Sequence, residues 1–249
     1  MVLRELAAQQ GLGFIDRSLY LWCLFFRPKN IRQIAAALDL SWATVAKACE
    51  RLEATDWMRM SKQPGRRICP IPTIPIRCEV EMAQLLEVEY GFAPNRGEFL
   101  MKRHLDMWVW SDAYVDNARP DFLRPTEDAP PLEYDRFYYQ AKVAFEFNGS
   151  QHYSASSTFG EDKGFRETRN HDLAKLALSQ QQGVSLITVS AEDLAPEAFR
   201  RLLPDNLALN YVNEDGPYYK TLARISLAYA AKTGRLDRQQ QRRSPGDKT

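Results

Sequence analysis

Three side chains that can bind a metal ion or carry a proton lie close together in the middle of the chain. Asp135, Glu146 and His152 fall within residues 132–153, where alternating aromatic and aliphatic residues predict a β-hairpin. A carboxylate buried alone in such a strand is strongly destabilising, so each one must face solvent, a partner or a cation. The sequence therefore predicts a site at which two carboxylates and an imidazole converge.

Two carboxylates at one end of a sheet suit a hard divalent cation. A phosphodiester resists hydrolysis because its negative charge repels nucleophiles, and a bound cation neutralises that charge and activates water. Asp135 and Glu146 are eleven residues apart, so a short turn near residues 140–142 sets them on adjacent strands at the same end of the hairpin. Alternation along the second strand places Glu146 on one face with Ala144 and Asn148, opposite an apolar face.

Composition places the chain among globular proteins. Its 249 residues are 45% hydrophobic and 26% charged, and no apolar run approaches the roughly 18 residues that span a bilayer. The first ten residues lack the basic-then-apolar order of a secretory signal, so we expect a cytoplasmic protein. The four cysteines show no CxxC spacing, which favours small core residues over a zinc site or disulfides.

The first third of the chain predicts three short helices and a hairpin. Apolar residues recur at helical spacing in residues 14–26, 31–38 and 42–54. Residues 57–61 and 68–71 then read as strands on either side of a tight basic turn. This order of elements resembles the winged helix-turn-helix domains of bacterial DNA-binding proteins. A small helical domain used for protein contact or dimerisation is the alternative.

Charge supports a role for this region in gripping phosphate. Residues 1–78 carry a net charge of +6, whereas the remaining residues carry −5. Basic and polar side chains on the outward face of the third helix suit contact with phosphates and base edges in a major groove. The candidate DNA-binding residues are Thr44, Lys47 and Arg51 on that helix and Lys62, Arg66 and Arg67 in the turn.

The rest of the chain predicts a second domain that alternates helix and strand, and strand, helix, strand gives an α/β sandwich. The expected domains are 1–71 for DNA binding, 72–94 as a linker and bridging helix, 95–235 as a catalytic domain and 236–249 as a disordered basic tail. Within them we expect helices at 79–90, from Pro94 onward, at 165–182, 196–203 and 218–233, and a buried strand at 184–189.

The polar residues of this domain occur in a familiar order. Glu98 on a helix, then Asp135, then Glu146 within FEFNGSQHY (residues 145–153), then Asp172, resembles the PD-(D/E)XK nuclease superfamily over about residues 95–195. The very-short-patch repair and EDxHD homing endonucleases are the most similar branch. The resemblance implies a restriction-endonuclease-like α/β/α sandwich that cleaves DNA with Mg²⁺ or Mn²⁺.

The same resemblance implies roles for individual residues. Asp135 would be the central metal ligand, with Glu146 and Glu98 assisting at the metal. His152 would act as general acid or base, and Asp172 would complete the polar network.

One position departs from the commonest motif of that superfamily. The lysine expected two residues after the second-strand acid is replaced by Asn148. Either His152 therefore moves the proton, which we favour because imidazole titrates near neutrality, or another lysine reaches the site. The candidates for such a lysine are Lys163 and Lys175, and Gln151 is a third auxiliary candidate.

Alternatives stay open at this level. The alternatives for single residues are a surface ion pair between Asp135 and Arg136, a loop cap for Glu146 and a satisfied core position for His152. A DNA-binding regulator with an inactive nuclease-like domain, or a nuclease that cleaves RNA, would fit the same sequence. We expect double-stranded DNA as partner, a homodimer as one option, no membrane and no nucleotide cofactor, since the chain lacks GxxxxGK[ST].

Overall fold

The computed structural model describes residues 2–28, 30–61, 69–111, 113–149 and 161–243, with the backbone alone for 161–170 and 235–243. The chain is mixed α/β and divides into two compact units. The N-terminal unit comprises Met1–Val88 and Tyr211–Thr221, and the C-terminal unit comprises Glu89–Asn210 and Leu222–Thr249. The chain thus crosses between the units three times: within α5 (Ile76–Phe92), between Asn210 and Tyr211, and within α9 (Pro217–Arg243).

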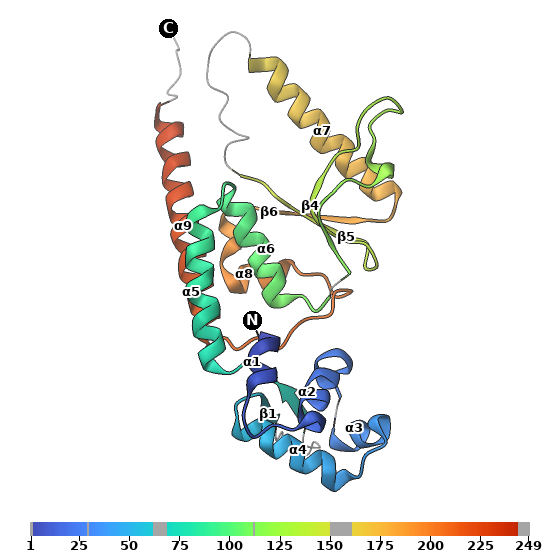
Figure 1. The fold of residues 1–249 in the computed structure, drawn as a ribbon. Helices are drawn as coiled ribbons and strands as arrows, with labels where there is room; N and C mark the ends of the chain where they lie inside the picture. Colours follow the sequence, from blue (N-terminus) through green and yellow to red (C-terminus); the bar gives the residue numbers. More distant parts are fainter. Residues whose placement is uncertain (1, 29, 62–68, 112, 150–160, 244–249) are drawn as a thin grey trace. The chain divides into compact units, whose positions relative to one another are not determined.

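Before α5, the N-terminal unit has four helices and a hairpin within its described residues (Figure 1). Helices α2 and α3 both pack against α4, and strands β1 and β2 pair antiparallel with Met58 opposite Pro72. The helix bounds agree with those predicted from the apolar periodicity. The elements are α1 (Val2–Ala8), α2 (Phe14–Phe26), α3 (Ile31–Leu38), α4 (Trp42–Ala54), β1 (Met58–Ser61) and β2 (Cys69–Pro72).

The turn between α3 and α4 is stabilised by a backbone cap at the end of α3 and a side-chain cap at the start of α4. Asp39 ends α3 in the left-handed region, with φ 52°, and Ser41 begins α4 by accepting a hydrogen bond from the Thr44 amide at 3.0 Å. Asn30 caps α3 in the same way, through the Gln33 amide. Such caps satisfy donors that the first turn of a helix leaves free, so this stretch encodes its own sharp turn.

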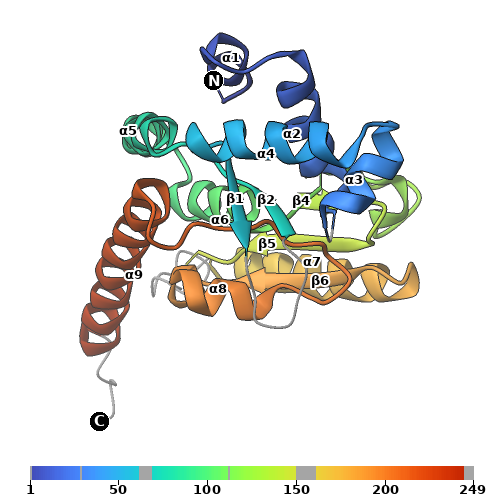
Figure 2. The ribbon, with the colours of Figure 1, turned by 90° about the horizontal axis from the view of Figure 1, so that it is seen from below.

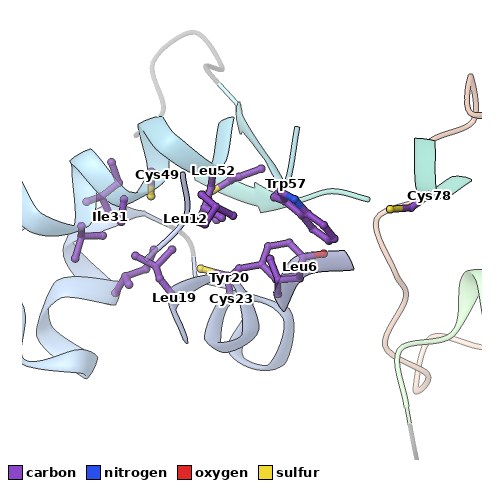
Figure 3. Packing of buried hydrophobic residues seen from close by; sticks show 14 residues of the cluster. Leu6, Leu12, Leu19, Tyr20, Cys23, Ile31, Cys49, Leu52, Trp57 and Cys78 are labelled. Atoms are coloured by element: carbon purple, nitrogen blue, oxygen red, sulfur yellow. The ribbon is translucent and has the colours of Figure 1, made fainter. Parts of the chain in front are cut away.

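The core of the N-terminal unit lies between α2, α4 and the hairpin (Figure 3). Trp57 lies edge-on to Tyr20 with ring centroids 5.3 Å apart, and both rings are buried. The Tyr20 hydroxyl donates to the carbonyl of Thr73 at 3.0 Å, which fastens α2 to the chain after β2. Around this pair are buried aliphatic and thiol side chains: Leu19, Cys23, Ile34, Val45, Cys49 and Leu52.

The C-terminal unit is built on a four-stranded sheet with strand order β3-β4-β5-β6. Strands β5 and β6 run parallel, and the other neighbours are antiparallel. Helix α7 runs along β6 in both views (Figures 1 and 2). The elements before and within the sheet are α6 (Arg96–Trp108), β3 (Val115–Ala118), η1 (Asp121–Leu123), β4 (Tyr134–Tyr138), β5 (Val143–Phe147), α7 (Glu161–Gln181) and β6 (Ser185–Val189), followed by η3 (Glu192–Leu194) and α8 (Pro196–Leu202).

Helices α6 and α7 pack on opposite faces of strand β5. Phe147 lies against Gly97 of α6, where a Cβ atom would collide with the Phe147 ring and lie 2.7 Å from the Tyr229 hydroxyl of α9. Glu146, one residue earlier and so on the other face, is bonded to Lys175 of α7. Only glycine allows α6 to approach the sheet this closely, and the next residue of α6 is Glu98.

The side chain of Arg136 on β4 connects this strand to its neighbour β3 and to helix α6. Its side chain is 1% exposed, donates to Asp106 at 2.6 Å and to Asp116 at 2.6 and 3.0 Å, and lies 4.1 Å from the centroid of the Tyr114 ring. A buried guanidinium needs such partners because its charge is otherwise costly to desolvate. The idea of a surface ion pair between Arg136 and Asp135 is therefore wrong, since Arg136 is buried and turned toward other carboxylates.

Several bounds differ from the sequence prediction: α7 begins at Glu161 instead of residue 165, and further differences occur at α5 and α9. Helix α5 begins at Ile76 instead of residue 79, because the Pro75 carbonyl accepts from the amides of Cys78 and Glu79 and starts the helix there. Helix α9 continues through residues 236–243, where a disordered tail was expected, since glutamine and arginine extend a helix readily once it has begun. Residues 244–249 lie outside the described residues.

Within the described residues, every helix is too short or too polar to cross a membrane.

Candidate active site

Asp135 and Glu146 lie at one end of the central hairpin. The β4–β5 pairing ends with Arg136 opposite Phe145, so Asp135 and Glu146 are the next residues on the two strands. Beyond this pair the Asp135 carboxylate accepts a hydrogen bond from the Phe147 amide at 2.7 Å. Glu146 acts on the pKa of Asp135, so the two carboxylates lie within electrostatic range of each other.

The electrostatics of Asp135 reflect burial beside other acids. The pKa of Asp135 is raised from 3.8 to about 6, mainly by desolvation and also by Glu98 and Glu146, while the Phe147 amide and Lys102 act in the opposite direction. A raised pKa means that the anion lacks compensation in the protein as it stands. A cation bound at this place would supply that compensation.

Lys175 brings an ammonium group to the second carboxylate. Its Nζ donates to Glu146 Oε1 at 2.5 Å, and the residue is only 9% exposed. One turn further along α7, Ser179 bonds to the hydroxyl of Tyr134 at 2.5 Å and to the Lys175 carbonyl at 2.6 Å. These contacts hold α7 against β4 and β5, so the lysine is fixed in place by the helix that carries it.

A second lysine lies on the α6 side of the site. Lys102 Nζ donates to Glu98 Oε1 at 2.6 Å and to Asn117 Oδ1 at 2.7 Å. Both members of the ion pair are largely buried, and Asn117 adopts a left-handed conformation with φ 52°. Neither Lys102 nor Asn117 was identified from the sequence, although the spacing of Glu98 and Lys102 is that of a helical ion pair.

A cavity of about 270 Å³ opens beside Glu146. Glu146, Asn148, Asp172 and Lys175 supply its polar lining, and leucines of α7 and β6 supply most of the rest. Asp172 thus lines the same space as Glu146, and it is exposed. The cavity has room for a phosphate group, with an ammonium and carboxylates at its wall.

The donor set suits a hard divalent cation. In the part of the chain that the structure describes, no group of three His, Cys, Asp or Glu side chains is placed to hold a metal ion together. Mg²⁺ does not require one, because it keeps several waters and is held by one or two carboxylates with substrate phosphates. Asp135 fits that requirement, with Glu146 and Glu98 both in electrostatic range of it.

Several predicted site residues cannot be placed. Gln151 and His152 lie outside the described residues, as do Lys62, Arg66 and Arg67 of the basic turn. Lys163 lies on α7, in the part where the backbone alone is described. Their proposed roles stay predictions.

The candidate DNA-binding face of α4 is partly committed to internal contacts. Thr44 shares a hydrogen bond with Ser41 at 2.8 Å, and Lys47 is exposed. Arg51 binds Asp16 of α2 through Nη2 at 2.6 Å and Nε at 3.0 Å, and Asp16 is 1% exposed. Of the three residues, Lys47 is therefore the clean probe for DNA contact, whereas Arg51 also stabilises the unit.

Alanine substitutions are expected to separate these two roles. Arg51→Ala removes the cation from a buried carboxylate and should lower the free energy of unfolding by about 1–3 kcal/mol. Lys47→Ala should leave stability within about 0.5 kcal/mol but weaken DNA binding and flatten its salt dependence. Urea denaturation and fluorescence anisotropy at several salt concentrations measure both. Equal losses of stability in Arg51→Ala and Lys47→Ala would contradict the structural role of Arg51. Unchanged DNA binding in Lys47→Ala would mean that this face of α4 does not contact DNA.

Comparison with protein-family models, with curated proteins and with solved structures finds no match to this chain. Its function has to be inferred from the residues of the site.

Proposed function

We propose that the chain is a metal-dependent endodeoxyribonuclease of PD-(D/E)XK type. In this proposal the C-terminal unit is a restriction-endonuclease-like α/β/α sandwich, and the N-terminal unit is a winged helix-turn-helix that grips duplex DNA. The observation that carries it is that Asp135 and Glu146, on neighbouring strands, lie within electrostatic range of each other, and that Lys175 of α7 is bonded to Glu146. Two acids and a lysine are the residue types that this chemistry uses.

The proposed division of labour follows from the contacts. A bound Mg²⁺ or Mn²⁺ would neutralise phosphate charge and acidify a water molecule, held by Asp135 and Glu146 with Glu98 in support. Lys175, already fixed beside Glu146, would hydrogen-bond the attacking water or a non-bridging phosphate oxygen. Lys175 thereby fills the role left open at Asn148, and its partner Glu146 keeps the ammonium oriented.

His152 remains the predicted proton carrier, and Lys175 reduces the share of the chemistry that it must supply. A lysine at the carboxylate pair can stabilise the developing charge, while an imidazole protonates the leaving oxygen. Asp172, on the cavity wall, suits a polar contact with the nucleic acid backbone through water.

The winged-helix part of the proposal rests on element order and packing. Three helices, a capped sharp turn between the second and third, and an antiparallel hairpin occur in the order that such domains require. The surface of α4 around Lys47 would face the major groove.

A nicking assay tests the function. Supercoiled plasmid and duplex RNA are incubated with the full chain in Mg²⁺, Mn²⁺, Ca²⁺ or EDTA, with Lys175→Met beside the wild type. We expect DNA cleavage in Mg²⁺ or Mn²⁺ and a loss of about 10²-fold in Lys175→Met. Lys142→Met is the matched control, because Lys142 lies in the β4–β5 turn and its ammonium group donates to the Gln182 carbonyl, away from the carboxylates of the site.

The outcomes distinguish the competing functions. DNA binding without cleavage in any metal would favour a regulator with an inactive nuclease-like domain. Cleavage of RNA alone would change the substrate but keep the site. Full activity in Lys175→Met would remove that residue from the mechanism.

A further inference from the structure

The site holds two lysines, which come from different helices. Lys175 of α7 is bonded to Glu146 at 2.5 Å, and Lys102 of α6 is bonded to Glu98 at 2.6 Å. Asp135, on which Glu98, Glu146 and Lys102 all act electrostatically, accepts from a backbone amide. Glu98 and Glu146 are therefore each occupied by an ammonium group in the metal-free protein.

The Glu98–Lys102 pair differs from an ordinary surface pair of a helix. Its side chains are 22% and 14% exposed, so water screens it less than a fully exposed pair. The pair also lies within electrostatic range of Asp135, since both of its charges act on that carboxyl group. An ion pair in this place changes how a cation is received at the site.

Lys102 has a second acceptor that Glu98 does not depend on. Asn117 Oδ1, on β3, receives the same ammonium at 2.7 Å. If Glu98 turned away, Lys102 would still be held by Asn117 and would not have to find a new partner. The arrangement therefore allows Glu98 to exchange its partner at small cost.

We propose that Lys102 is a latch that holds Glu98 away from the metal, and that metal loading requires Glu98 to exchange the ammonium of Lys102 for the cation. The inference rests on the proposed metal-dependent function. The latch sets the metal concentration at which the site becomes complete. Lys102 is a positioning residue, because it acts through Glu98.

Calorimetric titration of the full chain with MnCl₂ or MgCl₂, without DNA, tests the latch. Lys102→Met is expected to bind the metal about fivefold to tenfold more tightly than the wild type, because Glu98 then holds no ammonium group and keeps only the 3.2 Å bond from the Asn95 side-chain amide among its described contacts. Glu98→Gln and the double variant Glu98→Gln/Lys102→Met complete the cycle. In the glutamine background, loss of Lys102 should bring no gain in affinity.

The cycle separates the latch from simple charge repulsion. A general effect of the lysine charge would give the same gain in both backgrounds, and that result would overturn the proposal, as would unchanged or weaker binding in Lys102→Met. Lys102→Gln serves as a second variant, with circular dichroism to show that each protein is folded.

The failure of the latch and the failure of the proposed function are distinguishable. Metal binding by the wild type with no change in Lys102→Met would remove the latch alone. Binding by Lys102→Met but not by the wild type would support the latch in its strongest form. Absence of binding in both folded proteins would overturn the latch together with the metal-dependent function.

Discussion

Asparagine at position 135 is expected to lower the rate of Mg²⁺-dependent DNA cleavage by about 10³-fold or more, because the central oxygen donor of the cation is lost. The same substitution should stabilise the metal-free protein at neutral pH. In the wild type, burial raises the pKa of Asp135 to about 6, so the folded state resists ionisation of this group. Asparagine keeps an acceptor for the Phe147 amide and removes the buried charge.

The direction of the pH dependence follows from that shift. A raised pKa favours the folded state below the unfolded value of 3.8, and the advantage is lost as the pH rises to about 6. The stabilisation of Asp135→Asn over the wild type should therefore be small at pH 4 and reach about 2 kcal/mol at pH 7. Urea denaturation in EDTA at the two pH values measures it.

A matched control and a metal titration sharpen this test. Asp128→Asn alters an exposed carboxylate in the turn before β4 and should change neither cleavage nor the pH dependence. Added Mg²⁺ should raise the melting temperature of the wild type but not of Asp135→Asn. Cleavage that survives in Asp135→Asn, or an equal stability change at both pH values, would contradict the assignment of Asp135.

Methionine at position 136 is expected to destabilise the C-terminal unit by about 3 kcal/mol, since removing one partner of a buried ion pair leaves the others uncompensated. Arg136 is 1% exposed and binds Asp106 and Asp116, which are 29% and 41% exposed. Their partial exposure moderates the loss. Methionine keeps much of the aliphatic volume, so the effect reports the charge contacts.

Arg119→Met is the control for this change. Arg119 is 63% exposed and pairs with Glu133 at 2.7 Å, so its loss should cost less than about 1 kcal/mol. Urea denaturation compares the two variants. Equal effects would mean that Arg136 is not the tie between β4, β3 and α6 that its contacts indicate. Cleavage should fall in Arg136→Met only as far as the folded fraction falls.

The sequence predicts local elements well because their signals are local. The three N-terminal helices, the hairpin around Asp135 and Glu146, and the strand at residues 185–189 follow from periodicity and turn residues. The convergence of the two carboxylates follows from strand alternation and the length of the turn. Each of these properties is decided within about a dozen residues of the chain.

The interactions that the sequence did not reveal join distant elements. Arg51 is 35 residues from Asp16. The pattern of α4 indicates that Arg51 faces outward, but it does not indicate that Arg51 binds a buried aspartate of α2. Arg136 is bound to carboxylates from α6 and β3, whereas its neighbour in sequence suggested a local pair. Such partners depend on how the elements pack against each other, and the spacing of apolar residues does not predict that packing.

The two lysines of the site show the same limit in different ways. Lys175 was one of several candidates, and only the docking of α7 on β5 brings it to Glu146. Lys102 stands four residues after Glu98, a spacing so common on helix surfaces that it carries no functional signal by itself. Its significance comes from its second hydrogen bond, to Asn117 of β3, which is 15 residues away in the chain.

The attachment of α7 to the sheet has a kinetic consequence. Lys175 and Ser179 bind two different strands from successive turns of one helix. Proteins open locally in cooperative segments, with free energies well below that of global unfolding. If α7 opens as such a segment, the hydrogen bond from Lys175 to Glu146 breaks, while the carboxylates of Asp135 and Glu98 stay in place on β4 and α6. The lifetime of the docked helix would then set an upper limit on how long each molecule stays competent for catalysis.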